Sequence, residues 1–90
     1  IEVTDKLSGE KKKLEVSALF VAIGQVPDNK AFDGEVRIDD KGYVEGGEDC
    51  LTGTDGIYVA GDCRTKSVRQ LTTAAADGAV AGLAAATYAD

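Results

Sequence analysis

The stretch that decides the fold is Ile57-Tyr58-Val59-Ala60-Gly61-Asp62, a short apolar run that ends in a glycine and a carboxylate. A run of this length, bounded by turn residues, predicts a short buried strand. In open α/β sheets, ligands bind at the carboxyl ends of strands, which is where Asp62 stands. Gly61 lets a bulky group approach the backbone, and the ionised Asp62 can accept hydrogen bonds from the hydroxyls of a sugar or polyol.

A helix rich in small residues is predicted soon after this strand, from about Arg69 to about Tyr88. Its N-terminus is expected to point back toward the edge that carries Asp62. Unpaired N–H groups in the first turn, together with the helix dipole, favour an anion or an electron-rich carbonyl there. We expect these N–H groups to belong to Gln70, Leu71 and Thr72.

Spacing alone does not decide the role of Asp62 or the role of two glycines in the helix. Asp62 could merely cap a turn, with Arg69 and Gln70 as ordinary residues of a first helical turn. Gly78 and Gly82 each cost about 1 kcal/mol of helix propensity relative to Ala, so we expect a packing reason for them.

The N-terminal part of the chain predicts a hairpin and a second buried strand. Ile1–Thr4 and Leu14–Val16 alternate apolar with polar residues, and the run Lys11–Lys13 is expected at a solvated hairpin tip. The continuous apolar run Ala18–Ile23 predicts a strand covered on both faces, as in a parallel sheet.

A domain boundary is predicted at Pro27, which restricts the residue before it to extended backbone. The boundary divides the chain into residues 1–26 and 27–90. Beyond it, Asp39-Asp40-Lys41-Gly42 predicts the turn of another hairpin, with Gly42 supplying a positive φ.

Composition limits the class of protein. Ninety residues fit one small core, whose stability is expected to depend on a cofactor, a partner or flanking sequence. A formal net charge of −6 argues against nucleic acid and anionic membrane surfaces as partners. No run approaches the roughly 20 apolar residues of a membrane helix, and the start at Ile1 has no signal-like features, so we expect the chain to be cut from something longer.

The sequence contains few residues that could bind a metal or carry out redox chemistry. There is no His, and the acidic stretch between Asp39 and Asp49 does not match a calcium loop, so no metal site is predicted. Cys50 and Cys63 are expected to be reduced thiols of a cytoplasmic protein, with a disulfide between them as the main alternative.

Three segments resemble, in order and spacing, the C-terminal part of low-molecular-weight thioredoxin reductases within the pyridine nucleotide-disulfide oxidoreductases. They are FVAIGQVPD at residues 20–28, TDGIYVAGDC at 54–63 and RQLTTAAADGA at 69–79. The resemblance implies an α/β fold: an incomplete FAD/NAD(P)-binding Rossmann-like fold with β-hairpins, short parallel strands and one long C-terminal helix. Residues 1–26 would be the last strands of an NADPH-binding domain, and residues 27–90 the C-terminal portion of an FAD-binding domain.

The resemblance also implies roles for five residues. Asp62 would bind a ribitol hydroxyl of FAD, with Gly61 giving clearance. Arg69, Gln70 and Leu71 would lie beside the isoalloxazine ring, where backbone N–H groups stabilise negative charge on the reduced flavin.

The family's remaining motifs are not found in these ninety residues. Both glycine-rich dinucleotide motifs and the C-x-x-C dithiol are missing, and neither cysteine is assigned a catalytic role. The parent would be a homodimeric, NADPH-using reductase of thioredoxin or a similar disulfide protein, and the isolated chain is expected to be inactive. Two alternatives remain: a related flavoprotein with another acceptor, such as a ferredoxin–NADP reductase or an alkyl hydroperoxide reductase flavoprotein, and a non-catalytic module that self-associates.

Overall fold

The chain begins with a two-stranded antiparallel hairpin. In the computed structural model, which describes residues 1–90, β1 (Glu2–Thr4) pairs with β2 (Lys11–Lys13), and Glu2 lies opposite Lys13. The Asp5 carboxylate accepts hydrogen bonds from the backbone N–H groups of Leu7 and Ser8 and so fixes the turn.

The predicted hairpin is therefore confirmed, but its second arm is not where the sequence placed it. Lys11–Lys13 form a strand and not the tip, while Leu14 adds one last pair of hydrogen bonds, to Ile1. Glu15 and Val16 lie beyond the pairing. The turn takes up fewer residues than its polar composition suggested, so pairing begins earlier in the second arm.

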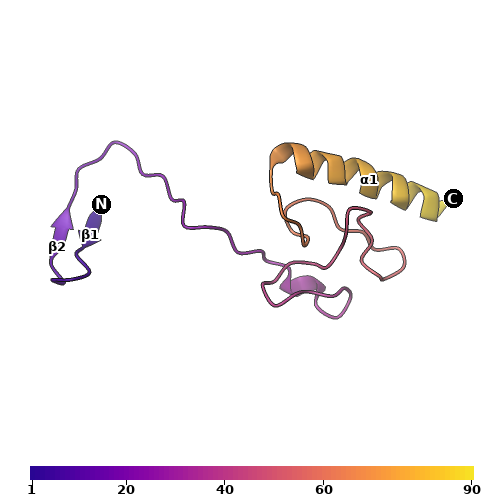
Figure 1. The fold of residues 1–90 in the computed structure, drawn as a ribbon, viewed down its shortest axis with the longest axis horizontal. Helices are drawn as coiled ribbons and strands as arrows, with labels where there is room; N and C mark the ends of the chain where they lie inside the picture. Colours follow the sequence, from indigo (N-terminus) through magenta and orange to yellow (C-terminus); the bar gives the residue numbers. More distant parts are fainter.

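An extended segment connects the hairpin to the rest of the molecule (Figure 1). The apolar run Ala18–Ile23 lies in it and forms no strand; the side chains of Phe20 and Ile23 are 94% and 93% exposed. The prediction of a buried strand here is wrong for this chain. A strand needs neighbours for its N–H and C=O groups, and these ninety residues place none beside the segment.

The C-terminal part is held together by turns and single bridges. After the 3₁₀ turn η1 (Lys30–Phe32), isolated bridges join Ile38 to Val44, Val44 to Arg64, and Leu51 to Tyr58. The first of these closes the predicted hairpin around Gly42, whose φ is 92°.

The core of this part is small. Its buried apolar side chains are Val44, Cys50 and Val59. The predicted strand 57–60 is reduced to the bridge at Tyr58, although Val59 is buried as expected. Gly46 packs so closely on Val59 that a Cβ on the glycine would lie 2.5 Å from Cγ1 of the valine.

Helix α1 (Leu71–Ala89) covers this part along one side (Figure 1). It packs through a stripe that runs from Ala74 through Asp77 to Tyr88, positions that share one helical face. At its C-terminal end, Tyr88 packs edge-on against Tyr58, with ring centroids 6.5 Å apart, and against Gly56. The predicted helix is confirmed within two residues at each end. Gly78 and Gly82, however, face open space, so the structure gives no packing reason for them.

The molecule is elongated, with principal extents of 63 × 27 × 20 Å. Its radius of gyration is 19.2 Å, against the roughly 12 Å of a compact domain of this length. The hairpin lies at one end and the helix-covered part at the other (Figure 1). The protein contains no helix that combines the length and the apolar character needed to cross a membrane.

Candidate functional site

The Gly-Asp turn, defined here as Gly61 and Asp62, lies between the buried Val59 and helix α1. Gly61 has a φ of 86°, a conformation that L side chains rarely adopt, and its carbonyl accepts a hydrogen bond from the N–H of Arg64. A Cβ at Gly61 would lie 3.7 Å from that of Ala74 on α1, so the turn rests on the helix. Asp62 is exposed, and its carboxylate makes no hydrogen bond or ion pair within the chain. The turn therefore presents a charged acceptor to the outside.

Arg69 folds back over this turn. Its Nε donates to the carbonyl of Asp62 at 2.9 Å, and its Nη2 donates to the carbonyl of Arg64 at 2.8 Å. The guanidinium carbon lies 3.8 Å from the ring centroid of Tyr43, a cation–π contact. Asp62, Arg69 and Tyr43 line one shallow pocket of about 210 Å³, together with Pro27. Two of the five predicted site residues thus meet, and Tyr43 joins them without having been predicted to do so.

The start of α1 differs from the prediction at one residue. The N–H of Gln70 donates to Oγ1 of Thr73 at 3.0 Å, so this group is not free for a ligand. The first turn of α1 keeps unpaired N–H groups at Leu71 and Thr72, as the general pattern of helix N-termini requires. Gln70 and Leu71 follow Arg69 directly in the chain, and the side chain of Leu71 is 89% exposed.

A buried charged cluster, defined as Arg64, Asp77 and Lys66, lies behind the Gly-Asp turn, and the exposed Glu48 adjoins it. Arg64 and Asp77 are only 1% and 4% exposed. Asp77 accepts from Arg64 Nε at 2.7 Å, from its Nη2 at 2.9 Å, from Lys66 Nζ at 2.9 Å and from the N–H of Gly61 at 2.9 Å. Glu48 adds a contact of 3.1 Å to Arg64 from the surface. Two cations and two carboxylates therefore balance one another.

Pairing keeps the two central groups charged. The pKa of Asp77 lies well below its ordinary value, first because Arg64 and then because Lys66 donates to the carboxylate, with the Gly61 N–H adding to both. The hydrogen bond to Asp77 raises the pKa of Arg64, against the opposing effect of burial. Both residues are thus ionised at neutral pH.

Sequence reasoning missed this cluster, although a signal was available. Asp77 is the only charged residue in α1, a helix otherwise made of small and apolar residues. It lies on the packed stripe, three residues after Ala74, where an uncompensated charge would be costly. A cation had to come from another segment, and Arg64 and Lys66 follow the Gly-Asp turn closely.

The two cysteines are free thiols. Cys50 is fully buried, has a φ of 61°, and donates from Sγ to the backbone carbonyl of Asp77 at 3.4 Å. Burial first, and the charge of Asp77 second, raise the pKa of its thiol. Cys63 is half-buried and donates to the carbonyl of Ala60.

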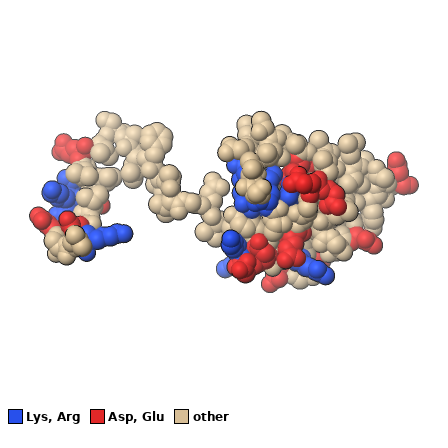
Figure 2. All heavy atoms as spheres, in the orientation of Figure 1, with Lys and Arg blue, Asp and Glu red and all other residues tan.

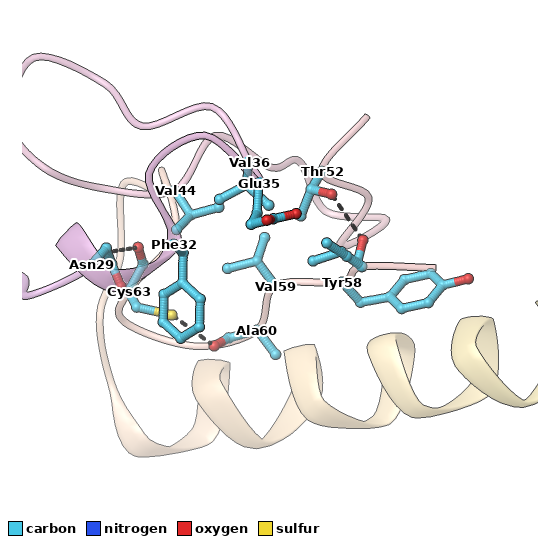
Figure 3. Close-up of a pocket in the computed structure, with 11 residues that line it drawn as sticks. Asn29, Phe32, Glu35, Val36, Val44, Thr52, Tyr58, Val59, Ala60 and Cys63 are labelled. Carbon is cyan, nitrogen blue, oxygen red and sulfur yellow. Dashed lines mark hydrogen bonds between the residues drawn. The ribbon is translucent and has the colours of Figure 1, made fainter. Parts of the chain in front are cut away.

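An apolar hollow opens beside the segment that carries the Gly-Asp turn, with the flanking residues Ala60 and Cys63 in its lining (Figure 3). It has a volume of about 550 Å³, and eight of its eleven lining residues are hydrophobic, with Phe32, Val44, Val59 and Tyr58 among them. Figure 3 shows Phe32 from η1, Val44 from a central loop and Val59 from the segment beside α1 around this hollow, while the ring of Tyr58 points away from them. The core is therefore open on this face.

Comparison with known proteins decides the family. Residues 2–78 match the pyridine nucleotide-disulphide oxidoreductase family. The chain belongs to that family. It is 43% identical over 70 residues to a thioredoxin reductase of Peptoclostridium acidaminophilum, a match that covers 78% of this chain and 22% of the relative.

Two further relatives cover nearly the whole chain. A thioredoxin reductase of Mycolicibacterium smegmatis is 40% identical over 84 residues, which are 92% of this chain and 27% of the relative. The 34.2 kDa protein in the rubredoxin operon of Clostridium pasteurianum is 40% identical over 88 residues, 98% of this chain and 29% of the relative. The chain thus spans about a quarter of the length of these curated relatives.

Proposed function

We propose that this chain is the C-terminal part of an FAD-dependent, NADPH-using thioredoxin-disulfide reductase, and that it supplies the ribitol and isoalloxazine side of the FAD site. The observation that carries the proposal is the Gly-Asp turn, which holds an unpaired Asp62 carboxylate at the surface beside Arg69 and the start of α1. The names of the relatives support the class of reaction.

The residues present fit a flavin. Asp62 is an acceptor with no partner in the chain, as binding a ribitol hydroxyl requires. Gly61 has no side chain to obstruct a ligand, and Leu71 and Thr72 offer N–H donors for the carbonyl edge of the ring. FAD, when bound, would take up a hydride from NADPH and pass the electrons to a disulfide. Asp62 would orient the ribityl chain, and the N–H groups of α1 would stabilise negative charge on the ring.

The remaining parts of the proposal concern the longer protein. We place the boundary between an NADPH-binding and an FAD-binding domain of Rossmann-like fold between residues 26 and 27. The parent would be a cytoplasmic homodimer that reduces thioredoxin or a similar disulfide protein. The isolated ninety residues would be inactive, because they contain neither glycine-rich dinucleotide motif and no C-x-x-C dithiol.

The test is the flavin content of the longer protein with and without Asp62→Ala. The substitution should lower the flavin absorbance that stays with the protein after desalting, because one ribitol contact is lost. Asp55→Ala is the matched control, since Asp55 is also an exposed carboxylate in a turn but lies outside the pocket of Asp62. Unchanged FAD content in Asp62→Ala would contradict the assignment.

The isolated chain gives a second test of the same proposal. Titrated with FAD, it should bind weakly or not at all, because the pyrophosphate-binding half of the site is not among its residues. A stoichiometric yellow complex of the ninety residues alone would overturn the half-site interpretation.

A second candidate, self-association, is favoured by the exposed apolar surface. Phe20 and Ile23 are almost fully exposed, and the apolar hollow lined by Phe32, Val44 and Val59 is open. Sedimentation velocity of the isolated chain over a range of concentrations tests it. A tight dimer would support an assembly module, and a monomer would argue against one.

A further inference from the structure

Asp77 links helix α1 directly to the Gly-Asp turn. Its Oδ2 accepts the N–H of Gly61 at 2.9 Å, and this is the only hydrogen bond between the side chains of α1 and the backbone of the turn. Residue 77 is in the second turn of the helix, so the bond ties Gly61 to the same rigid element whose first turn carries Leu71 and Thr72. The turn and the helix start therefore cannot shift independently while this bond exists.

Arg64 extends this link to the other predicted flavin contacts. Its guanidinium holds both oxygens of Asp77, while its backbone carbonyl accepts Nη2 of Arg69. Arg69 in turn donates Nε to the carbonyl of Asp62. A continuous path of hydrogen bonds thus runs from Asp77 through Arg64 and Arg69 to Asp62, besides the direct bond to Gly61.

Stabilising a small core does not require a buried cluster of charged side chains. A buried ion pair is often no more stabilising than apolar residues of the same volume, so stability alone is a weak reason for its presence. Its geometry gives another reason, since a carboxylate with four donors has one orientation only. Fixed orientation is what a cofactor site needs from the residues behind those that touch the cofactor.

We propose that Asp77, held by Arg64 and Lys66, is a positioning residue that sets the Gly-Asp turn relative to the N-terminus of α1, and thereby the position of the flavin between them. The inference rests on the proposed function, because it assigns Asp77 a role toward the same flavin. Asp77 itself lies behind the turn and is not expected to touch the cofactor.

The experiment compares Asp77→Asn with wild type in the longer protein. The amide can still accept the N–H of Gly61 but cannot pair with two cations, so the turn should lose its fixed orientation. We expect the dissociation constant for FAD, measured by titrating the apoprotein, to rise at least tenfold, and the visible circular dichroism of the bound flavin to change. Glu48→Gln is the matched control: it also neutralises a partner of Arg64 but leaves Asp77 untouched, and it should keep the dissociation constant within twofold.

A merely structural role would give a different result. If Asp77→Asn lowers the thermal midpoint of the apoprotein while FAD affinity and the visible circular dichroism stay as in wild type, the proposal is overturned. Asp77→Glu is the conservative variant and should recover part of the lost affinity. Should the Asp77 variants fail to fold, a crystal structure of the wild-type flavoprotein decides: Gly61 N bonded to the Asp77 carboxylate supports the proposal, and a Gly61 N–H bonded elsewhere refutes it.

Failure of this inference can be told apart from failure of the proposed function. A wild-type protein without flavin, or Asp62→Ala with full flavin content, would remove the proposed function. A wild-type protein that loses FAD on Asp62→Ala but is indifferent to Asp77→Asn would remove the role of Asp77 alone.

Discussion

The N-terminal and C-terminal parts of this chain differ in which side chains they expose and which they bury. In residues 1–26 large apolar side chains are exposed, as Phe20 is at 94%, whereas residues 27–90 bury two charged side chains, Arg64 at 1% and Asp77 at 4% exposure. The segment that connects the two ends of the molecule carries no charged residue from Val16 to Pro27, and it appears in Figure 2 as a tan strip. Residue type alone therefore does not decide burial.

The difference lies in what each segment has beside it. Arg64 meets Asp77 from a helix and Glu48 from a loop, so its charge is compensated inside the protein. The apolar run Ala18–Ile23 meets no other segment, so its side chains stay in water despite the favourable free energy of burial. Long-range neighbours, which the C-terminal part has and the N-terminal part lacks, decide the outcome.

The largest effect is expected from Arg64→Met, which removes the central cation of the buried charged cluster. Asp77 would keep only Lys66 as a charged partner, and we expect a loss of about 3 kcal/mol in the free energy of unfolding. Thermal unfolding of the ninety-residue chain followed by helical circular dichroism measures it. Lys11→Met in the hairpin is the matched control, because Lys11 is 69% exposed and should change stability by less than about 0.5 kcal/mol. Equal losses in the two variants would refute the contrast between the two parts.

A smaller effect is expected from acid. Folding lowers the pKa of Asp77 below its ordinary value of 3.8, so the unfolded chain takes up the proton first as the pH falls. The stability contributed by Asp77 should be fully present above about pH 5 and decline progressively below it. Urea unfolding of the C-terminal part over this range measures the decline.

Two variants separate this acid effect by region. Asp77→Asn should flatten the decline. Asp5→Asn should leave it unchanged, although backbone N–H groups of Ser8 and Leu7 also lower the pKa of Asp5, because that carboxylate lies in the separate hairpin. An acid decline that persists undiminished in Asp77→Asn would count against the cluster as its source.

The smallest effect is expected from Phe20→Ser. Its side chain loses almost no contacts on substitution, so the stability of the isolated chain should change by less than about 0.5 kcal/mol. Val59→Ser, at a residue that is 6% exposed, should cost about 2 kcal/mol in the same unfolding assay. A concentration-dependent loss in Phe20→Ser would instead indicate that the apolar run is covered by a second copy of the chain.

Local patterns predicted the local elements well. The small-residue helix, the turn at Gly42 and the first hairpin were all expected, because each depends on residues close together in the chain. The run Ala18–Ile23 was misjudged because a strand depends on partners that its own sequence does not name. Burial of Val59 was foreseen, but the strand around it was not formed for the same reason.

The candidate site also has a part that the sequence predicts and a part that depends on long-range contacts. The Gly-Asp turn and Arg69 could be named from the resemblance to a family, and the structure brings them together. The lone charge of Asp77 in a small-residue helix indicated a buried cation, but the choice of Arg64 depends on how the segment between residues 64 and 77 folds. The assignment of these residues to a flavin stays a prediction until the titrations are done.

The buried thiol of Cys50 has one practical consequence. Its Sγ lies against the backbone of α1 at Asp77, so a maleimide can reach it only when the helix lifts away from the loop. The half-buried Cys63 offers a second, more accessible thiol in the same molecule. The ratio of the two alkylation rates therefore measures how often α1 lifts away from the loop at Asp77, the residue whose carboxylate binds the N–H of Gly61.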